Sequence, residues 1–405
     1  MRHRARRRKS SRSHPAYNAS VSRKRLRVVL VLASLAVALL VSELVLRTVR
    51  PQPTYSELLR ESPPMTRAST IVPASLEPNV RCTVERPEFS IPIAINGQGL
   101  RMDREVTPRK THGTRIGVVG DSFVFGWGVK AEEAFPQVLE RLLRERGKDV
   151  EVLNFGFAYG FAPDAYYAAL AEKTAFDCDI LVEAVFVGND FTVGPGMEWL
   201  ELDADGLPRR VQAKYCVVEE SRLRSRTALL RYRIPVLRDS HAFLGLARAF
   251  FGATTLDPES DADNERIYDK RLYEETWPDW MEKSFQDITR CVVGLADRTR
   301  RQGHGFVVVT IPTLEQVHEI KVTTTNGRSV VTGRLRPAPR DEVPQRRFHA
   351  ALARANVARI DLLPPLVAAQ ATDLYYLADR HFRPHAHAIA ARMLADTLAP
   401  ALEGK

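Results

Sequence analysis

The chain is poor in cysteine, and its cysteines form no metal-binding pattern. Only four occur among 405 residues, and no two of them share the C-x-x-C spacing that is typical of zinc sites. This scarcity argues against a zinc-stabilised domain. In an oxidising compartment one disulfide can form, and buried free thiols are the alternative. The four are Cys82, Cys178, Cys216 and Cys291.

Several catalytic and ligand-binding signatures are absent as well. No G-K-[ST] triplet follows a glycine-rich loop, which excludes a P-loop nucleotide site. The Gly-x-Ser-x-Gly elbow of α/β-hydrolases does not surround the candidate serine described below. The acidic turn at 203–206 is too short for a calcium loop, because Leu207 and Lys214 stand where oxygen ligands are needed.

Outside the first 27 residues the chain has almost no net charge. These residues contain eleven Lys or Arg and no acid, so removing their charge from the total of +10 leaves −1 for residues 28–405. A nucleic-acid-binding domain needs its positive charge on the folded surface, where it can follow the phosphates. The charge distribution therefore argues against nucleic acid as a partner of the folded domain.

Residues 28–46 form an apolar run that is interrupted only by Ser34, Ser42 and Glu43. As a helix it would span about 28 Å, close to the thickness of a bilayer core. A cleaved signal peptide has a shorter apolar region and a small-x-small site, which is missing here. We therefore expect an uncleaved single-pass anchor. Because the basic residues precede it, the N-terminus should stay cytoplasmic, with the part of the chain after Arg50 outside the inner membrane of a bacterium.

Composition divides the chain into four parts. Residues 1–27 form a basic cytoplasmic arm, residues 28–46 a transmembrane helix and residues 47–84 a linker rich in Pro, Ser and Thr. Residues 85–405 form the main domain, which carries a long insertion at 192–275. The apolar part of this insertion, residues 227–251, predicts a helical hairpin packed on the core, and a lid over a bound ligand or a face that lies on the membrane is the alternative.

The main domain alternates apolar strands with helical segments. Residues 132–146 place apolar side chains at i, i+3, i+4, i+7 and i+8, which is typical of a helix with one buried face. Strands that alternate with helices predict a parallel sheet covered by helices on both faces, a three-layer α/β/α arrangement. The predicted strands are 116–119, 150–154, 180–187, 306–311 and 357–362.

Polar residues that can perform chemistry follow the first three strands. Ser122 comes directly after the first strand, where a backbone N–H and a helix start favour developing negative charge. Asn189 follows the third strand, and its amide can point at the same oxygen. Gly160 lies in a glycine-containing block after the second strand, and a glycine lets a backbone N–H approach closely. These groups predict a serine nucleophile with an oxyanion site.

The C-terminal region supplies a base. His381 can accept the serine proton, and Asp379, two residues earlier, can hold the imidazole in the correct tautomer. A competing interpretation is a metal site that combines these two residues with His385 and His387. Pro384 argues against it, because proline favours the first turn of a helix and leaves His381 in the preceding loop.

The order Gly-Asp-Ser at 120–122, the glycine block, Gly-Asn-Asp at 188–190 and Asp-x-His at 379–381 resembles the SGNH (GDSL-type) hydrolase superfamily, and most closely its membrane-anchored bacterial members. The resemblance implies a doubly wound, flavodoxin-like sheet of order 2-1-3-4-5. It also implies Ser122 as nucleophile, His381 as base, Asp379 as orienting acid, and Gly160 and Asn189 as oxyanion donors. Many members place the acid three residues before the histidine, where this chain has Ala378.

The resemblance implies a membrane-anchored serine esterase or deacylase that uses neither metal nor organic cofactor. Its substrate would be an acylated small molecule, glycan or lipid, with an O-acetyl ester as one form. Two alternatives remain open at this stage. One is an acyltransferase that modifies an envelope or exported polysaccharide, since only the acceptor differs. The other is a catalytically inactive carbohydrate-binding or scaffolding domain.

Overall fold

A computed structural model gives the structure of the chain in two compact units. The first comprises Met1–Leu58 and Leu230–Leu256, and the second Leu59–Leu229 and Asp257–Lys405. The structure describes residues 15–49, 65–67, 71–72, 75–111, 113–158, 162–173, 176–192, 200–211, 240–243, 269–325, 328–337 and 341–403.

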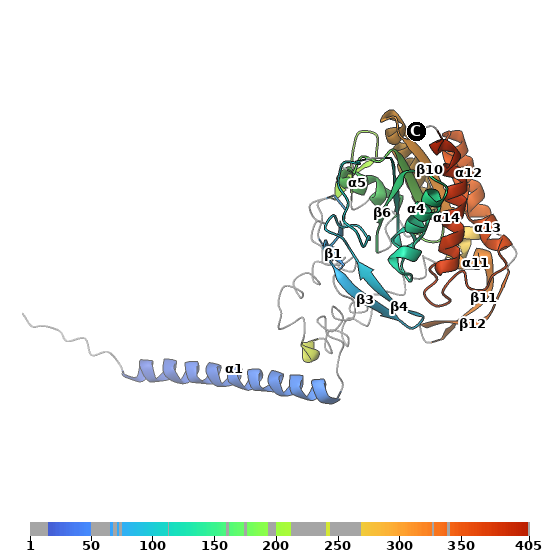
Figure 1. Cartoon of the computed structure of the whole chain (residues 1–405). Coiled ribbons are helices and arrows are strands. Elements are labelled where there is room, and N and C mark those ends of the chain that lie inside the picture. Colours follow the sequence, from blue (N-terminus) through green and yellow to red (C-terminus); the bar gives the residue numbers. More distant parts are fainter. Residues whose placement is uncertain are drawn as a thin grey trace, which may run out of the picture. The chain divides into compact units, whose positions relative to one another are not determined.

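The second unit is built around a five-stranded parallel sheet (Figure 1). Its strands lie in the order β13-β10-β7-β5-β6. Read from the β6 edge and numbered along the chain, this order is 2-1-3-4-5. All four pairings are parallel. The predicted doubly wound sheet and its strand order are therefore confirmed. The strands are β5 (Thr114–Gly120), β6 (Val150–Gly156), β7 (Ile180–Phe186), β10 (Gly305–Ile311) and β13 (Ala358–Asp361).

Helices cover both faces of the sheet because successive strand residues point to opposite sides. Val118, Val152 and Val182 pack in one core with α4, α13 and α14. Neighbouring residues such as Val119 and Leu153 pack in a second core with α5 and α10, and a third core adds α12. The helices are α4 (Phe135–Glu145), α5 (Pro163–Lys173), α10 (Asp279–Arg301), α12 (Val343–Arg354), α13 (Leu363–Ala368) and α14 (Pro384–Leu398).

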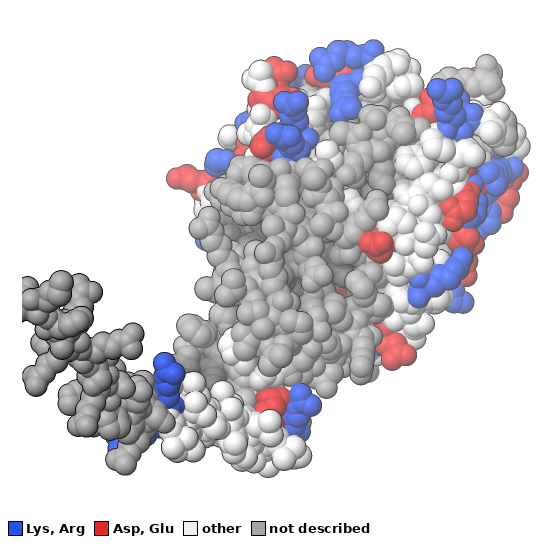
Figure 2. Space-filling view, turned by 90° about the vertical axis from the view of Figure 1, so that its left-hand side faces the viewer, with Lys and Arg blue, Asp and Glu red and all other residues white. Residues whose placement is uncertain are grey.

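Short hairpins and helical turns complete the described parts of this unit. The hairpin of β3 and β4 precedes the sheet in the chain, and the turn at 203–206 joins β8 to β9. Figure 2 shows basic and acidic residues interspersed over the described surface of the visible face, in keeping with the near-zero charge after residue 27. The remaining elements are β1 (Thr66–Arg67), β2 (Ser75–Leu76), β3 (Arg81–Arg86), β4 (Phe89–Ala94), α3 (Ser122–Phe125), η1 (Ala131–Glu133), β8 (Leu200–Leu202), β9 (Pro208–Val211), η5 (Lys270–Tyr273), α11 (Leu314–Val317), β11 (His318–Thr325), β12 (Arg328–Pro337) and η6 (Pro400–Leu402).

The first unit contains one long helix, α1 (Pro15–Val49), which begins inside the basic segment. Its part Arg25–Val49 is long and apolar enough to cross a membrane, a test that a signal sequence near the N-terminus also passes. The carboxylate of Glu43 accepts hydrogen bonds from the Ser240 hydroxyl and from the backbone N–H groups of His241 and Ala242. The acidic residue in the apolar run thus contacts a segment of the long insertion. Most of the predicted hairpin at 227–251 lies outside the described residues.

Glu183 is an acidic residue in the middle of β7, and it is fully buried. Among the described residues, neither of its carboxylate oxygens has a hydrogen-bond partner. Burial raises the pKa of Glu183 to about 8, because the ionised form loses its hydration. Burial likewise raises the pKa of Asp164 in α5 to about 7, against the hydrogen bond from Ala165. Both groups therefore link folding to pH.

We expect the protein to lose stability as the pH rises from about 4.5, the ordinary pKa of a glutamate, to about 8. The folded state keeps a proton on Glu183 that the unfolded chain has already released, so the free energy of unfolding falls until the pH passes the folded pKa of about 8. Glu183→Gln should remove part of this decline and stabilise the protein at pH ~9 by about 1–3 kcal/mol. Thermal melts at several pH values measure this, with the exposed Glu145→Gln on α4 as control. A parallel decline in wild type and Glu183→Gln would contradict the assignment.

Candidate active site

The turn after β5 presents Ser122 at the carboxyl end of the sheet. Asp121 caps the short helix α3, because its carboxylate accepts a hydrogen bond from the Phe123 N–H at 2.9 Å. Ser122 is the first helical residue and is 8% exposed. Among the described residues, none accepts a hydrogen bond from its N–H group. The serine therefore combines a nearly buried hydroxyl with a free backbone donor.

The end of β6 holds α3 in place. The Asn154 side chain donates to the Val124 carbonyl at 2.9 Å and accepts from the Gly156 N–H at 2.9 Å. Gly156 lies so close to the helix that a Cβ there would stand 2.1 Å from the Phe125 nitrogen. This contact is with backbone, so a side chain cannot be accommodated by rotation.

We expect Gly156→Ala to destabilise the domain by about 3 kcal/mol or more, since overpacking against rigid backbone forces the turn after β5 to move. Chemical denaturation measures the change. The control is Gly305→Ala at the start of β10, where the atom nearest to the added Cβ would be a flexible Ile180 side-chain carbon at 3.3 Å. If the two variants lost equal free energy of unfolding, close packing of Gly156 against α3 would not explain the effect.

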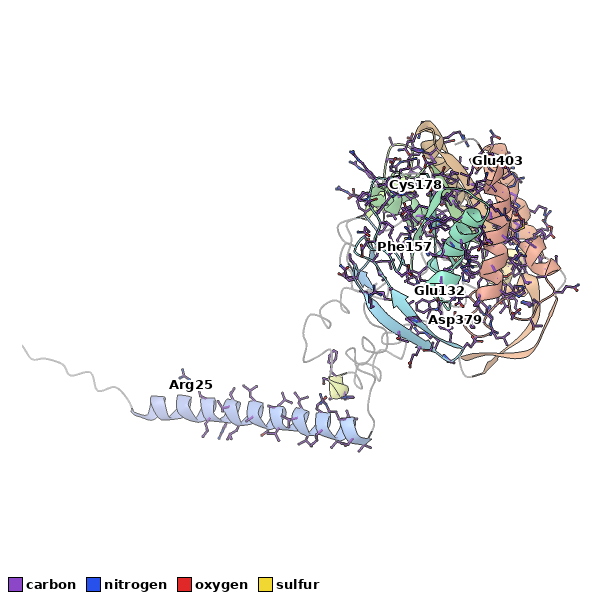
Figure 3. The ribbon with its side chains drawn as sticks, viewed as in Figure 1. Arg25, Glu132, Phe157, Cys178, Asp379 and Glu403 are labelled. Carbon is purple, nitrogen blue, oxygen red and sulfur yellow. The ribbon has the colours of Figure 1, made fainter. Side chains whose placement is uncertain are left out.

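A chain of hydrogen bonds joins Ser122 to the C-terminal region. Its hydroxyl lies 2.7 Å from Nε2 of His381, and the other imidazole nitrogen, Nδ1, lies 2.6 Å from Oδ1 of Asp379. Figure 3 shows Asp379 at the end of the domain opposite Cys178, which precedes β7. The site thus lies at the carboxyl ends of the parallel strands, where ligands bind in open α/β sheets.

Asp379 is held as an anion by its surroundings. Burial acts to raise the pKa of its carboxyl group, but the hydrogen bond and charge of His381, the indole N–H of Trp127 and the charge of Arg86 outweigh burial, and the net pKa lies below its ordinary value. The Trp127 indole donates to Oδ2 at 3.2 Å, while Oδ1 faces the imidazole. An ionised Asp379 stabilises the imidazolium that forms when His381 takes a proton.

The loop that carries these residues is a tight turn. The Tyr376 N–H donates to the His381 carbonyl at 2.9 Å, and Tyr375 and Phe382 form an antiparallel bridge. Arg380 has a left-handed φ of 69° and forms an ion pair with Glu315. The loop therefore returns on itself, which brings the side chains of Asp379 and His381 within hydrogen-bond distance of each other.

The two predicted oxyanion residues are described unequally. Asn189 follows β7, and among the described residues its buried Oδ1 atom has no partner. Gly160 lies outside the described residues. The N–H groups of Gly156 and Phe157 donate to Asn154 and Gly120, so neither is free to bind substrate. A donor from the β6 side must therefore come from beyond Phe157, and Gly160 stays a prediction.

The other two histidines have separate partners. Nδ1 of His385 lies 2.9 Å from the Asp373 carboxylate at the surface. His387 is fully buried on α14, and its Nδ1 accepts from the Phe135 N–H. Burial, with lesser effects of nearby positive charge, lowers the pKa of His387 to about 3, so the imidazole stays neutral. The structure therefore does not gather them with His381 into the alternative metal set.

Two buried carboxyl groups adjoin the site. Asp121 precedes Ser122, and Asp190 follows Asn189. Burial raises the pKa of Asp121 to about 6, although the Phe123 N–H and the charge of His381 oppose it. Burial, followed by the charge of Asp121, raises the pKa of Asp190 well above its ordinary value. The carboxyl groups of Asp121 and Asp190, buried beside the site, are therefore less ionised than exposed aspartates.

Sequence reasoning missed Trp127 and Glu88. Trp127 follows the candidate serine by five residues and contacts Asp379, and Glu88 accepts hydrogen bonds from the loop that carries Asp379. A tryptophan close to the Gly-Asp-Ser turn was a visible signal. Nothing near Glu88 in the sequence indicates its distant partners, which lie about 290 residues away.

One family model matches the C-terminal part of the chain. Residues 273–405 match the family model described as "SGNH hydrolase-like domain, acetyltransferase AlgX". The C-terminal third of the chain is thus similar to an SGNH hydrolase-like domain. The match and the fold confirm the resemblance that the sequence motifs indicate, while the span Arg25–Val49 remains a candidate anchor.

Several solved structures similar to this chain are described as esterases or lipases. They include a lipase/acylhydrolase from Enterococcus faecalis (13% identity, 72% of this chain and 98% of that chain, TM-score 0.36) and the acetyl xylan esterase AlAXEase (10%, 70% and 99%, 0.35). A third is a mutant of Axe2, an acetyl-xylooligosaccharide esterase from Geobacillus. It is 10% identical, the match covers 71% of this chain and 95% of that chain, and the TM-score is 0.36. No curated protein matches the chain. At such low TM-scores, the residue roles below come from the geometry of this chain alone.

Proposed function

We propose that this SGNH hydrolase-like domain is a serine esterase or deacylase, anchored in the membrane by residues 28–46 with its catalytic domain on the extracytoplasmic side. The observation that carries the proposal is the continuous chain Ser122–His381–Asp379, with distances of 2.7 Å and 2.6 Å. These are hydrogen-bond distances between a hydroxyl, a base and an orienting acid. The arrangement differs from a scaffolding domain, which needs no such chain.

In the proposed mechanism Ser122 Oγ attacks the carbonyl carbon of an acyl ester while His381 Nε2 accepts its proton. Asp379 holds the imidazole through Nδ1–H and stabilises its positive charge. The tetrahedral oxyanion is bound by the free N–H of Ser122, with Asn189 and Gly160 as the further donors. His381 then donates the proton to the departing alcohol, which leaves an acyl-serine. Water, activated by His381, releases the acid. No step uses a metal or an organic cofactor.

Ser122→Ala should abolish hydrolysis of an activated acetyl ester, with a loss in kcat of about 1,000-fold or more, because no other group can form the acyl-enzyme. The full-length chain in detergent is assayed with p-nitrophenyl acetate, and covalent labelling by a fluorophosphonate probe is followed by mass spectrometry. Ser284→Ala serves as the control, since Ser284 is buried in α10 and its hydroxyl has no partner among the described residues. Unchanged hydrolysis by Ser122→Ala would reject the proposal.

A second candidate function is transfer of the acyl group to a glycan hydroxyl. The family match favours it, because the description of that family names an acetyltransferase. The same three residues serve, since a sugar hydroxyl can replace water in the second step. The substrate of either reaction would then be an O-acyl ester of a small molecule or a glycan.

The partition of the acyl group distinguishes hydrolysis from transfer. The protein is supplied with an activated acetyl donor and an excess of a polysaccharide acceptor, and free acetate and glycan-bound acetate are quantified. Hydrolysis predicts that free acetate remains the main product at every acceptor concentration, because water is the acceptor. Transfer predicts that acetylated glycan increases at the expense of acetate. Ser122→Ala must remove both products, otherwise the acetyl group moves without the enzyme.

A further inference from the structure

Glu88 binds the loop that carries the candidate base and acid. Its carboxylate accepts three backbone hydrogen bonds: from Leu377 at 2.8 Å, from Ala378 at 2.9 Å and from Asp379 at 2.8 Å. Three successive N–H groups that point at one carboxylate form a charge-assisted contact, which is stronger than a bond between neutral groups. The bound segment ends at Asp379, two residues before His381.

Glu88 comes from a part of the fold that lies outside the parallel sheet. It lies in the turn between β3 and β4, a two-stranded hairpin outside the parallel sheet. The neighbouring Phe89 packs against Tyr376, with ring centroids 5.0 Å apart, and against the edge of Trp127 at 6.3 Å. The hairpin therefore contacts both the C-terminal loop and the turn that follows Ser122.

These contacts join the two halves of the site. The Tyr376 hydroxyl donates to the Gly128 carbonyl at 2.8 Å, next to Trp127. Arg86, on the same hairpin, lies over the Trp127 ring at 5.5 Å, and that indole donates to Asp379. Asp379 is thus held at its backbone by Glu88 and at its side chain by Trp127. Its remaining carboxylate oxygen is directed at the imidazole.

We propose that Glu88 is a positioning residue for the Ser122–His381–Asp379 chain, holding the loop 377–381 so that the imidazole meets the serine hydroxyl. This inference rests on the proposed serine chemistry. It does not depend on which acyl acceptor is used. The loop returns on itself through a left-handed Arg380. Its backbone N–H groups donate to the Glu88 carboxylate, and its Tyr376 ring packs against Phe89. Loss of the carboxylate frees three N–H groups and allows the loop to move.

A positioning role has a different signature from a purely structural role. Misplacement of His381 by a fraction of an ångström lowers the rate of the chemical step and leaves substrate binding intact. A purely structural residue changes the melting temperature, and the kinetics of the folded fraction stay the same. The readouts are therefore kcat, KM and the rate of fluorophosphonate labelling, each expressed per folded protein.

The test uses Glu88→Ala, Glu88→Gln and a control on the same hairpin, Glu85→Gln. The Glu85 residue is exposed, and the N–H groups of residues 377–379 donate to Glu88 instead. We expect Glu88→Ala to lower kcat and the labelling rate about 10- to 100-fold with KM changed less than about 3-fold. Glu88→Gln keeps one acceptor oxygen and should fall between Ala and wild type. Glu85→Gln should match wild type. Should Glu88→Ala not fold, Glu88→Gln carries the comparison.

A spectroscopic readout makes the test independent of turnover. The proton shared between His381 and Asp379 gives a low-field signal in the proton NMR spectrum, identified by its loss in His381→Ala. We expect this signal to weaken or shift in Glu88→Gln. If wild type hydrolyses the ester and all Glu88 variants retain wild-type kcat, labelling rate and signal, the inference is overturned. If wild type lacks both hydrolysis and labelling, the proposed function fails, and the NMR signal alone decides the role of Glu88.

Discussion

The site depends on one long-range constraint: the last part of the chain must return to the end of β5. His381 lies 259 residues after Ser122, and their hydrogen bond closes that separation. The return is made by α14, which packs with α4 in the core that covers one face of the sheet. Buried His387 accepts a hydrogen bond from the first residue of α4, which fixes the start of α14 relative to the sheet. Loss of this packing would separate base from nucleophile while leaving each local turn intact.

Much of this architecture could be read from the sequence because it follows local rules. Apolar runs without alternation indicated buried parallel strands, and Pro384 marked the first residue of the helix after His381. Residues at strand ends converge in a parallel sheet, so Ser122 could be expected near residues that follow neighbouring strands. Spacing alone placed Asp379 within reach of the imidazole, and the structure puts the two 2.6 Å apart. Their catalytic roles stay predictions.

Other features could not be predicted because they depend on tertiary packing. The contact of Glu88 with residues 377–379 requires the β3–β4 hairpin to lie beside the C-terminal loop, and no periodicity encodes that. Gly156 follows the same strand as the predicted donor Gly160, but its N–H donates to the Asn154 side chain, a pairing that the sequence does not indicate. The carboxyl group of Glu183 is buried in β7, a strand that is otherwise apolar. Gly160 and most of the insertion at 192–275 lie outside the described residues, so the expectations for them stand unchanged.

Buried carboxyl groups concentrate where β5 and β7 adjoin. Asp121, Glu183 and Asp190 each have at least one oxygen without a partner among the described residues. Such groups reduce stability, and in natural proteins they are commonest close to functional sites. A large apolar core on both faces of the sheet compensates for them. The buried carboxyl groups near Ser122 thus lower the stability of the fold, and the apolar cores offset this cost.

The contact between Glu43 and residues 240–242 joins two segments of the first compact unit that lie about 200 residues apart in the chain. An acidic side chain inside an apolar helix is unfavourable unless its oxygens find donors. The Ser240 hydroxyl and the N–H groups of His241 and Ala242 supply them. The only acidic residue of the apolar run 28–46 therefore fastens this part of the insertion to α1.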